Sequence, residues 1–446
     1  MNISINKLLV LGVLLGGPGP GAGQSVSPAT LSLDDALSQA RVANPTLQAA
    51  YAEARGASQD ALAATRAFLP TVRADVRGTR TNDPVGVFGL KLRQSGFGNA
   101  DFAIDALNDP SPFNGFTSAV TVELPLIAPA GVFGFKAAQS AGRARTAQAN
   151  RLAGATAFQV TQAYWDAQLI AEQVTALEVA LEAVRAHERA AVAFREQGLV
   201  TGLDERLAAL RASEVEVRLV AAEAEALNAQ SRLRTLLGLS EDEALTLTDQ
   251  LSTDPTSSCD ETECDPANRG DLQALDAAVE ASRSATRGAW GAQLPQLAVF
   301  GVVSHHAADA PWAAGSGDWA VGLGLQWNLF PGLGGVAAVR KASAESEAAR
   351  ARLDAAERQA VLEIESARRR LTAAARAVDI AQRAQIQARD ALEQANQRYG
   401  AGISPITELL DVQAAATEAL ISHLSARRDL LVAHALVEFS YGAWDQ

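Results

Sequence analysis

Residues 47–70, LQAAYAEARGASQDALAATRAFLP, and residues 272–295, LQALDAAVEASRSATRGAWGAQLP, decide the fold because they are two copies of one pattern. In each copy a Leu-Gln-Ala triplet is followed, 23 residues after its Leu, by the Pro of a Leu-Pro pair. Solenoid repeats have periods of roughly 20–50 residues, so a period of about two hundred indicates a duplicated half-molecule.

The repeated pattern continues past the two Leu-Pro pairs. The strand-like residues 122–126, VELPL, correspond to residues 325–329, LQWNL. The separation from Leu126 to Gly198 is 72 residues, and that from Leu329 to Gly402 is 73. Each half is therefore predicted to hold a helix, two strands and then very long helices.

The composition agrees with a helical protein that does not bind nucleic acid. The chain has 446 residues, a formal net charge of −13 and only 5% aromatic residues, and it is rich in alanine. Abundant alanine favours long, closely packed helices. An acidic chain without a basic stripe argues against a nucleic-acid partner.

Residues 1–23 are predicted to be a signal peptide. Lys7 provides a positive charge, residues 8–15 are apolar, and Gly21-Ala22-Gly23 forms a small-x-small cleavage site. The alternative, an apolar anchor, is disfavoured because the run is short and breaks at Gly and Pro. No later run reaches about 18 apolar residues, so we expect any membrane crossing to use strands.

The first structural repeat is predicted to span residues 24–239. Its apolar residues switch from helical spacing to period two after Leu69-Pro70, where Val72, Ala74 and Val76 share one face. A stretch rich in Gly, Pro, Asn and Asp over 82–115 predicts a long loop. The expected strands cover about 71–81 and 117–127, and the expected long helices cover about 133–196 and 203–237.

The first of these long helices carries a coiled-coil pattern. Val174, Leu177, Leu181 and Val184 repeat at steps of three and four residues, as in a heptad seam. At ~1.5 Å per residue this helix would be about 95 Å long.

Residues 240–268 are predicted to be an irregular linker between the repeats. They contain Cys259 and Cys264, the two cysteines of the chain. Export would permit a local disulfide between them, and two reduced thiols are the alternative. A metal-binding loop is disfavoured because the segment lacks histidine and a second cysteine pair.

The second repeat, residues 269–446, contains the clearest strand. Between Trp319 and Leu329, bulky apolar residues alternate with small or polar ones, which is the pattern of outer-membrane barrel strands. Trp319 and Trp327 near its ends are predicted to be lipid-interface anchors. A half-buried strand of a soluble sheet is the alternative. The remaining predicted elements are a strand over about 296–304 and helices over about 336–398 and 404–440.

Four strands cannot close a membrane barrel, since the smallest use about eight. Unpaired strand edges are excluded from lipid, so other copies of the chain must complete the sheet. Twelve strands from three copies leave an open lumen, whereas eight from two nearly fill it. The expected fold class is α+β dominated by helices and internally duplicated. A long coiled-coil-like helical barrel joins four strands per chain in a 12-stranded trimeric outer-membrane β-barrel.

The chain resembles the TolC-like outer-membrane efflux proteins over about residues 30–442. The resemblance rests on the two Leu-Pro helix exits, the two strand pairs, and residues 398–403, RYGAGI, leading into 409–413, LLDVQ. It implies a homotrimer in the outer-membrane lipid of a Gram-negative cell, with a large periplasmic part. Such a channel-tunnel is a passive exit duct, used in efflux or type I secretion. Its partners are a periplasmic adaptor (membrane fusion protein) and an inner-membrane pump.

The resemblance also assigns site residues. Asp204, Tyr399 and Ser404 fall at the periplasmic gate, where Ser404 replaces an arginine and Leu203 replaces a polar partner. Glu408 and Asp411 fall at an acidic ring. Six carboxylates from three copies would favour cations and bind divalent ions. The alternative is that both acids solvate a helix start.

The predicted helix-tip turns contain Gly198, Gly202 and Gly402. Glycine at such positions permits the backbone conformation that ends a helix.

Two other classes of protein fit the sequence less well. A periplasmic coiled-coil adaptor or structural protein without a membrane barrel would show one helical hairpin, whereas this chain shows two. An enzyme is disfavoured because the sequence has no nucleophile elbow, phosphate-binding loop or zinc signature. The adjacent His305-His306 pair is expected to be an exposed loop feature at a strand end. No cofactor and no metal are expected.

Overall fold

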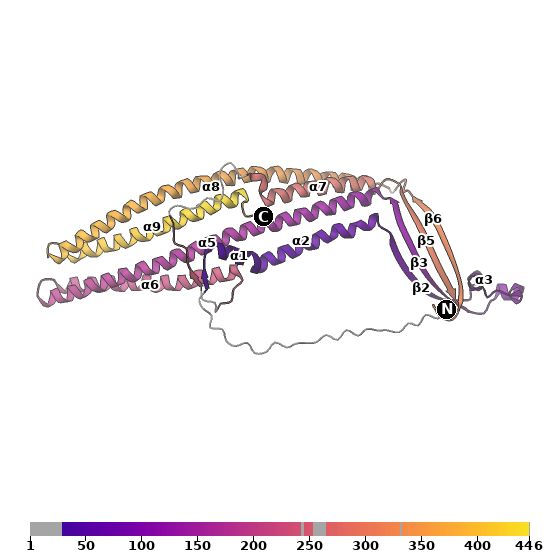
Figure 1. The fold of residues 1–446 in the computed structure, drawn as a ribbon, viewed down its shortest axis with the longest axis horizontal. Coiled ribbons are helices and arrows are strands. Elements are labelled where there is room, and N and C mark those ends of the chain that lie inside the picture. Colours follow the sequence, from indigo (N-terminus) through magenta and orange to yellow (C-terminus); the bar gives the residue numbers. More distant parts are fainter. Residues whose placement is uncertain (1–28, 242–244, 253–264, 331, 446) are drawn as a thin grey trace.

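The computed structural model describes residues 29–241, 245–252, 265–330 and 332–445. The predicted signal peptide, Cys259 and Cys264 lie outside these residues. The described chain is a long rod of helices with a four-stranded sheet at one end and two helical hairpin tips at the other (Figure 1). The predicted fold class is confirmed in that the protein is mostly helical, with very long helices and four antiparallel strands.

The first repeat begins with two short helices that have local start signals. In α1 (Leu33–Ala43) the Ser32 hydroxyl accepts from the Asp35 N–H and the Asp35 carboxylate accepts in return, which is a capping box. In α2 (Pro45–Ala64) Asn44 caps the first turn and Pro45 takes the first position. The other long elements are β2 (Thr71–Thr81), β3 (Phe113–Ile127), α5 (Pro129–Glu196) and α6 (Gly202–Leu237).

The prediction of a long loop over 82–115 was wrong. The segment contains α3 (Pro84–Arg93), a 3-10 turn (Asn99–Phe102) and α4 (Ile104–Asn108), and β3 starts early at Phe113. Its Pro and Asp residues start a helix here, because the Asp83 carboxylate accepts from the Gly86 N–H at 2.6 Å.

The second repeat has the same order of elements. It comprises α7 (Gly270–Gly291), β5 (Gln296–Ala307), β6 (Gly315–Gln326), α8 (Gly334–Gly400) and α9 (Ile406–Tyr441). β6 ends before the predicted limit of 329, so Trp327 lies just past the strand. The expectation for His305-His306 was also wrong. Both lie inside β5, and buried His306 bonds Thr117 Oγ1 at 3.1 Å and Asp318 at 3.0 Å.

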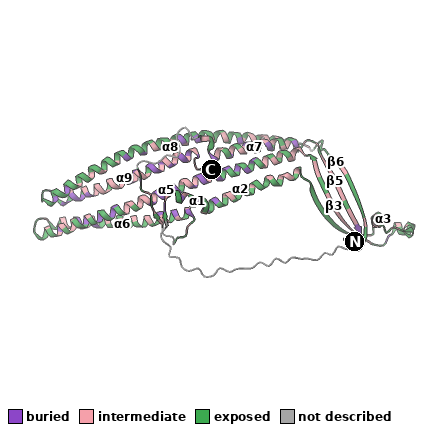
Figure 2. Ribbon diagram, in the orientation of Figure 1, coloured by how far each residue is buried: buried purple, intermediate pink, exposed green. Residues whose placement is uncertain are grey.

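The four long strands form one antiparallel sheet in the order β2-β3-β5-β6. The two hairpins of the repeats pair through β3 and β5, so β2 and β6 are the open edges of the sheet. Figure 2 shows that these strands are largely exposed or half-buried in the single chain, whereas the buried residues concentrate along the helices.

The linker between the repeats contains a strand, contrary to the prediction that it is irregular. Strand β4 (Leu245–Leu247) pairs in parallel with β1 (Ala29–Leu31). The hydroxyl of Tyr164, fully buried in α5, donates to the Leu31 carbonyl at 2.9 Å. A three-residue strand is short, and its partner is far away in sequence, so no local period revealed it.

The helices pack closely through small residues. α5 lies along α2 and α7 near the sheet and along α6 farther out, while α8 lies along α7 and α9. At each junction the long return helix ends at a left-handed glycine, Gly238 (φ +67°) or Gly442 (φ +76°). A Cβ on Gly238 would lie 2.6 Å from the Ala43 carbonyl oxygen, and one on Gly442 would lie 2.9 Å from Arg269 Cα. Both turns therefore need glycine for backbone shape and for space.

Among the described residues, no helix is long and apolar enough to cross a membrane.

Candidate functional site

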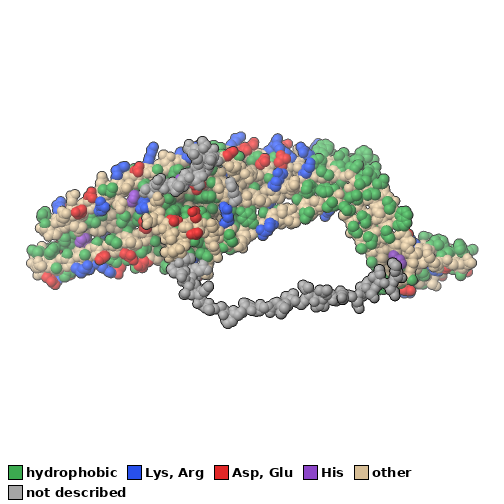
Figure 3. Space-filling view, in the orientation of Figure 1, with side chains coloured by type: hydrophobic (Ala, Val, Ile, Leu, Met, Phe, Trp, Pro, Cys, Tyr) green, Lys and Arg blue, Asp and Glu red, His purple; other side chains and the backbone are tan. Residues whose placement is uncertain are grey.

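One face of the four-stranded sheet is apolar from edge to edge. Strand register places the following residues on this face: Val72, Ala74, Val76, Val120, Val122, Leu124, Leu297, Val299, Gly301, Val303, Trp319, Val321, Leu323 and Leu325. The β6 row is 69–76% exposed. Hydrophobic side chains gather over this end of the molecule (Figure 3). A continuous exposed apolar surface of this kind marks contact with a partner or with lipid.

The opposite face of the sheet is polar. It carries Arg73, Asp75 and Arg77 on β2, Thr121 and Glu123 on β3, Ser304 and His306 on β5, and Asp318 on β6. The register also places Ser118 and His305 on the first face, beside Val76, so the apolar band ends there. A sheet with an apolar band on one face and charged residues on the other fits a wall between lipid and water.

The two candidate interface anchors lie at opposite ends of the apolar face. Trp319 is 76% exposed, and the Trp327 indole donates to the Gln293 carbonyl at 3.0 Å. Eight residues of strand span about 26 Å, or about 20 Å of height at a tilt of roughly 40°, close to the ≈ 25 Å apolar band of outer-membrane barrels.

At the other end of the rod, both hairpin tips use one turn. The N–H groups of Gly198 and Leu199 donate to the carbonyls of Arg195 and Phe194, each at 2.9 Å. Gly402 and Ile403 donate to Tyr399 and Arg398, also at 2.9 Å. Gly198 and Gly402 have φ of +73° and +71°, which glycine adopts without strain.

Gly202 does not belong to either turn. It is the first residue of α6 and lacks the left-handed backbone of Gly198 and Gly402. The turn ends one residue before Gly202, and its left-handed position is taken by Gly198.

The structure brings the candidate gate residues Tyr399 and Ser404 into the second tip, both nearly buried. Within the described residues, neither side-chain hydroxyl has a hydrogen-bond partner. The Tyr399 ring lies 5.8 Å from that of Phe194 on the other hairpin. Burial raises the pKa of the Tyr399 phenol, and the nearby charge of Asp204 adds to the rise. In the described chain the two hydroxyls are therefore buried polar groups without a hydrogen-bond partner, which are uncommon in a folded chain.

Asp204 faces its own helix start. Its carboxylate accepts from the Thr201 N–H at 2.8 Å and from the Thr201 hydroxyl at 2.7 Å. This is a capping box, in which Asp204 stabilises the start of α6.

Each candidate ring acid has an arginine partner. Glu408 lies 3.4 Å from Arg398 across the second hairpin, and Asp411 lies 3.2 Å from Arg211 on α6. The Asp411 side chain is nevertheless 75% exposed. These two arginine partners were not predicted from the sequence, because no local periodicity links α6 to α9 or α8 to α9. The position of Arg398 opposite Glu408 follows from the turn between them.

The two tips are held together by an apolar cluster contributed by all four long helices. Its members are Val184, Ala191, Ala208, Ala212, Ala395, Tyr399, Ile406, Leu409 and Leu410. The Arg211–Asp411 ion pair crosses between the same hairpins. Separating the hairpins would expose this cluster and break the ion pair.

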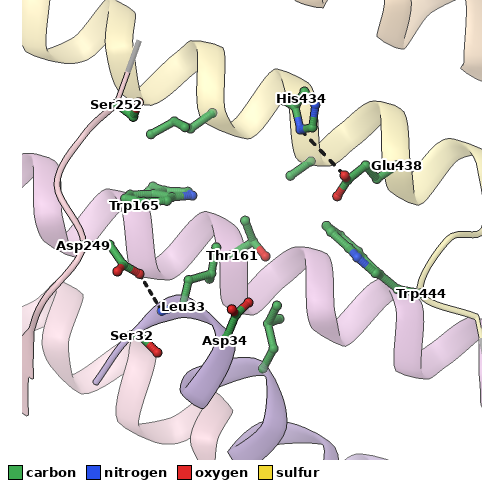
Figure 4. A pocket seen from close by; sticks show the side chains of 13 residues that line it. Ser32, Leu33, Asp34, Thr161, Trp165, Asp249, Ser252, His434, Glu438 and Trp444 are labelled. Carbon is green, nitrogen blue, oxygen red and sulfur yellow. Dashed lines mark hydrogen bonds and ion pairs between the residues drawn. The ribbon is translucent and has the colours of Figure 1, made fainter. Parts of the chain in front are cut away.

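A cavity of about 510 Å³ lies midway along the rod, between α1, α5 and α9 (Figure 4). Trp165 and Trp444 form parts of its wall, and several of its polar groups contact neighbours in the chain. The Asp249 carboxylate accepts from the Leu33 N–H at 2.7 Å, and His434 lies 3.8 Å from Glu438. These contacts tie the linker and helix ends together and do not form a reactive set.

Comparison with known proteins finds a family match over the second repeat and the same fold over nearly the whole chain. The family model described as "Outer membrane efflux protein" matches residues 266–443. No curated protein matches the chain by sequence.

Solved structures match along nearly the whole chain. The outer-membrane channel OprN has 19% identity and a TM-score of 0.77, over 93% of this chain and 91% of that one. The CmeC outer membrane channel of Campylobacter jejuni has 15% identity and a TM-score of 0.77, over 92% and 85%. The open state of the MtrE outer membrane channel of Neisseria gonorrhoeae has 17% identity and a TM-score of 0.76, over 95% and 93%. These three structures share the fold of the chain.

Proposed function

We propose that the chain is a member of the outer membrane efflux protein family and that three copies of it form a passive exit duct. In this proposal the protein lies in the outer membrane of a Gram-negative cell, with its helical rod in the periplasm. Substrates enter this duct from an inner-membrane pump through a periplasmic adaptor.

The observation that carries the proposal is a sheet with an apolar face and two open edges. The exposed N–H and C=O groups of β2 and β6 need partners in lipid, and β6 of one copy can pair with β2 of the next. Three copies close twelve strands around a polar lumen, which is wide enough to stay open. Trp319 and Trp327 then lie at the two lipid–water interfaces.

The hairpin tips form the periplasmic gate in this proposal. The unpartnered hydroxyls of Tyr399 and Ser404 meet polar groups of a neighbouring copy, and Asp204 contributes its charge beside them. Because Ser404 is short and uncharged, the ion pair of Arg211 with Asp411 serves as the charged tie between hairpins. Opening separates the hairpins and exposes the apolar cluster at their tips.

The proposed acidic ring is tested by single-channel recording in planar bilayers. The reconstituted trimer is expected to conduct with a preference for cations and to be blocked by divalent cations. Changing Glu408→Gln together with Asp411→Asn removes the ring carboxylates and is expected to weaken that block.

The matched control is Glu214→Gln, since Glu214 also pairs with Arg211 at 2.8 Å but lies outside the proposed ring. Divalent block that is unchanged in the double variant would refute the ring assignment. A purified trimer that shows no conductance would refute the duct itself.

A further inference from the structure

The segment between β2 and β3, here called the distal arm (residues 84–108), leaves apolar side chains uncovered at both of its ends. Val85 is 79% exposed at its start, and Phe102 and Ile104 are 66% and 74% exposed at its tip. We propose that the tip of one distal arm docks onto the start of the distal arm of the next copy, forming a continuous ring at the outer mouth. This inference rests on the proposed trimer, because it requires a neighbour.

The path of α3 across the sheet supports the proposal. The helix starts just after β2, one open edge, and its ten residues span about 15 Å. The distance from β2 to β6 is three strand spacings, or about 14 Å. At the far end, Ser316 of β6 donates to the Arg93 carbonyl, and the Gln94 amide donates to the Ala307 carbonyl of β5 at 3.2 Å. α3 therefore crosses the whole sheet from one open edge to the other.

Beyond that point the tip projects past β6. Figure 1 shows the distal arm leaving the sheet on the β6 side. In the proposed trimer β6 pairs with β2 of the next copy, and the α3 helix of that copy starts where its β2 ends. The tip of one distal arm and Val85 of the next copy therefore lie side by side in the proposed trimer.

The distal arm lies on the polar face of the sheet. A Cβ on Gly115, which shares that face with Thr117 and Thr121, would lie 2.5 Å from Leu90 Cδ2. The Lys91 ammonium lies 5.6 Å from the centre of the Phe113 ring on the same face. Lipid covers the opposite face, so the apolar tip is directed toward protein and not toward the bilayer.

The tip is also held in a fixed shape. The rings of Phe88 and Phe97 lie 4.8 Å apart, and those of Phe97 and Phe102 lie 5.1 Å apart, both edge to face. Lys91 pairs with Asp101 at 2.5 Å. Docking an ordered surface costs less conformational entropy than ordering a loop.

Charge is complementary across the proposed contact. The tip carries exposed Asp105 and Asp109, and β2 carries exposed Arg77 on the polar face, where the distal arm lies. Within the described residues none of these three has an ion-pair partner in its own chain. A contact between two different ends of the same element closes a ring when the subunits are related by rotation.

The proposal is tested by disulfide trapping. Cys259→Ser and Cys264→Ser first remove the native thiols, and Val85→Cys with Ile104→Cys then places one thiol at each end of the distal arm. Oxidation of the protein in outer-membrane vesicles is expected to give covalent dimers and trimers on a non-reducing gel. Each single variant is expected to stay uncrosslinked, as is the pair Val85→Cys with Val179→Cys, since Val179 is 65% exposed on distant α5.

Other outcomes would overturn the proposal in distinguishable ways. A trimer by mass that conducts but yields no crosslink, or only a fast-migrating intrachain disulfide, overturns the docking and leaves the duct intact. A monomer by mass removes both the duct and the neighbour that docking needs. As a second measurement without thiols, Ile104→Asp is expected to lower the temperature at which the trimer dissociates, and an unchanged temperature would count against the contact.

Discussion

The two hairpin tips share one turn and differ in the helix start that follows it. Gly198 and Gly402 occupy the same place in the same hydrogen-bonded motif, with φ within a few degrees. The following helix α6 begins with a capping box from Thr201 and Asp204. Helix α9 begins at Ile406, and its N-cap residue, Pro405, provides no capping side chain. The two repeats therefore have the same turn at their tips but different residues at the start of the helix that follows it.

This difference changes the role of one acidic position. Asp204 and Glu408 each lie three residues after the cap of their helix. Asp204 bonds its own Thr201, whereas Glu408 pairs with Arg398 on the preceding helix. A carboxylate that is not used for capping is available for longer contacts, so the second tip is the better candidate for a part that moves.

The tips also differ in what they bury, and the largest predicted effect follows from that. Leu409 is 1% exposed in the cluster that joins the hairpins. Leu409→Ala is expected to cost at least about 2 kcal/mol of local stability, because it removes buried methyl groups and leaves a cavity. Hydrogen exchange of amides in both tips should then speed up about thirtyfold or more.

The control for this change is Leu203→Ala in the first tip, where the side chain is 64% exposed. Its effect should stay within about 0.5 kcal/mol. Equal acceleration by the two variants would mean that the cluster does not hold the hairpins together.

A smaller effect tests whether the two turns are equivalent. Gly198→Ala and Gly402→Ala each force a Cβ into a left-handed conformation, at an expected cost of about 1–2 kcal/mol. A Cβ at either position would have nothing within 4 Å, so backbone strain alone sets the cost. We expect the two variants to accelerate exchange at their own tips by similar factors. A difference of more than tenfold would show that the turns are not equivalent.

Much of the fold could be predicted because it repeats and because its periods are long. The helix expected over about 336–398 spans Gly334–Gly400, and the strand expected over 71–81 spans Thr71–Thr81. Tyr399 and Ser404 could be placed at one tip because a helix-ending Gly402 separates them. These features follow from local rules that act within about ten residues.

The features that sequence could not supply depend on contacts between distant segments. β4 pairs with β1 more than two hundred residues away, and Arg211 meets Asp411 across two hairpins. The distal arm was missed for a different reason. Its Gly and Pro residues resemble a loop, and only the Asp83 cap and the packing on β3 and β6 make it a helix.

The smallest predicted effect exchanges the caps of the two tips. Thr201→Ala removes half of the first capping box and should cost about 1 kcal/mol at the start of α6. Pro405→Thr supplies the matching half in the second tip, because Thr followed three residues later by Glu408 is a capping-box sequence. Glu408 is then expected to turn from Arg398 toward its own helix start. The first change should speed exchange at the start of α6 by about fivefold, and the second should slow it at the start of α9 by a similar factor.

Arg398→Ala provides the reference for the second change, since it frees Glu408 without offering a cap. If Pro405→Thr slows exchange, while Arg398→Ala does not, the new cap is responsible and the acid has changed partners. If both variants behave alike, Glu408 stays beside Arg398 in the Pro405→Thr variant. The cap would then not explain why the two tips treat equivalent carboxylates differently.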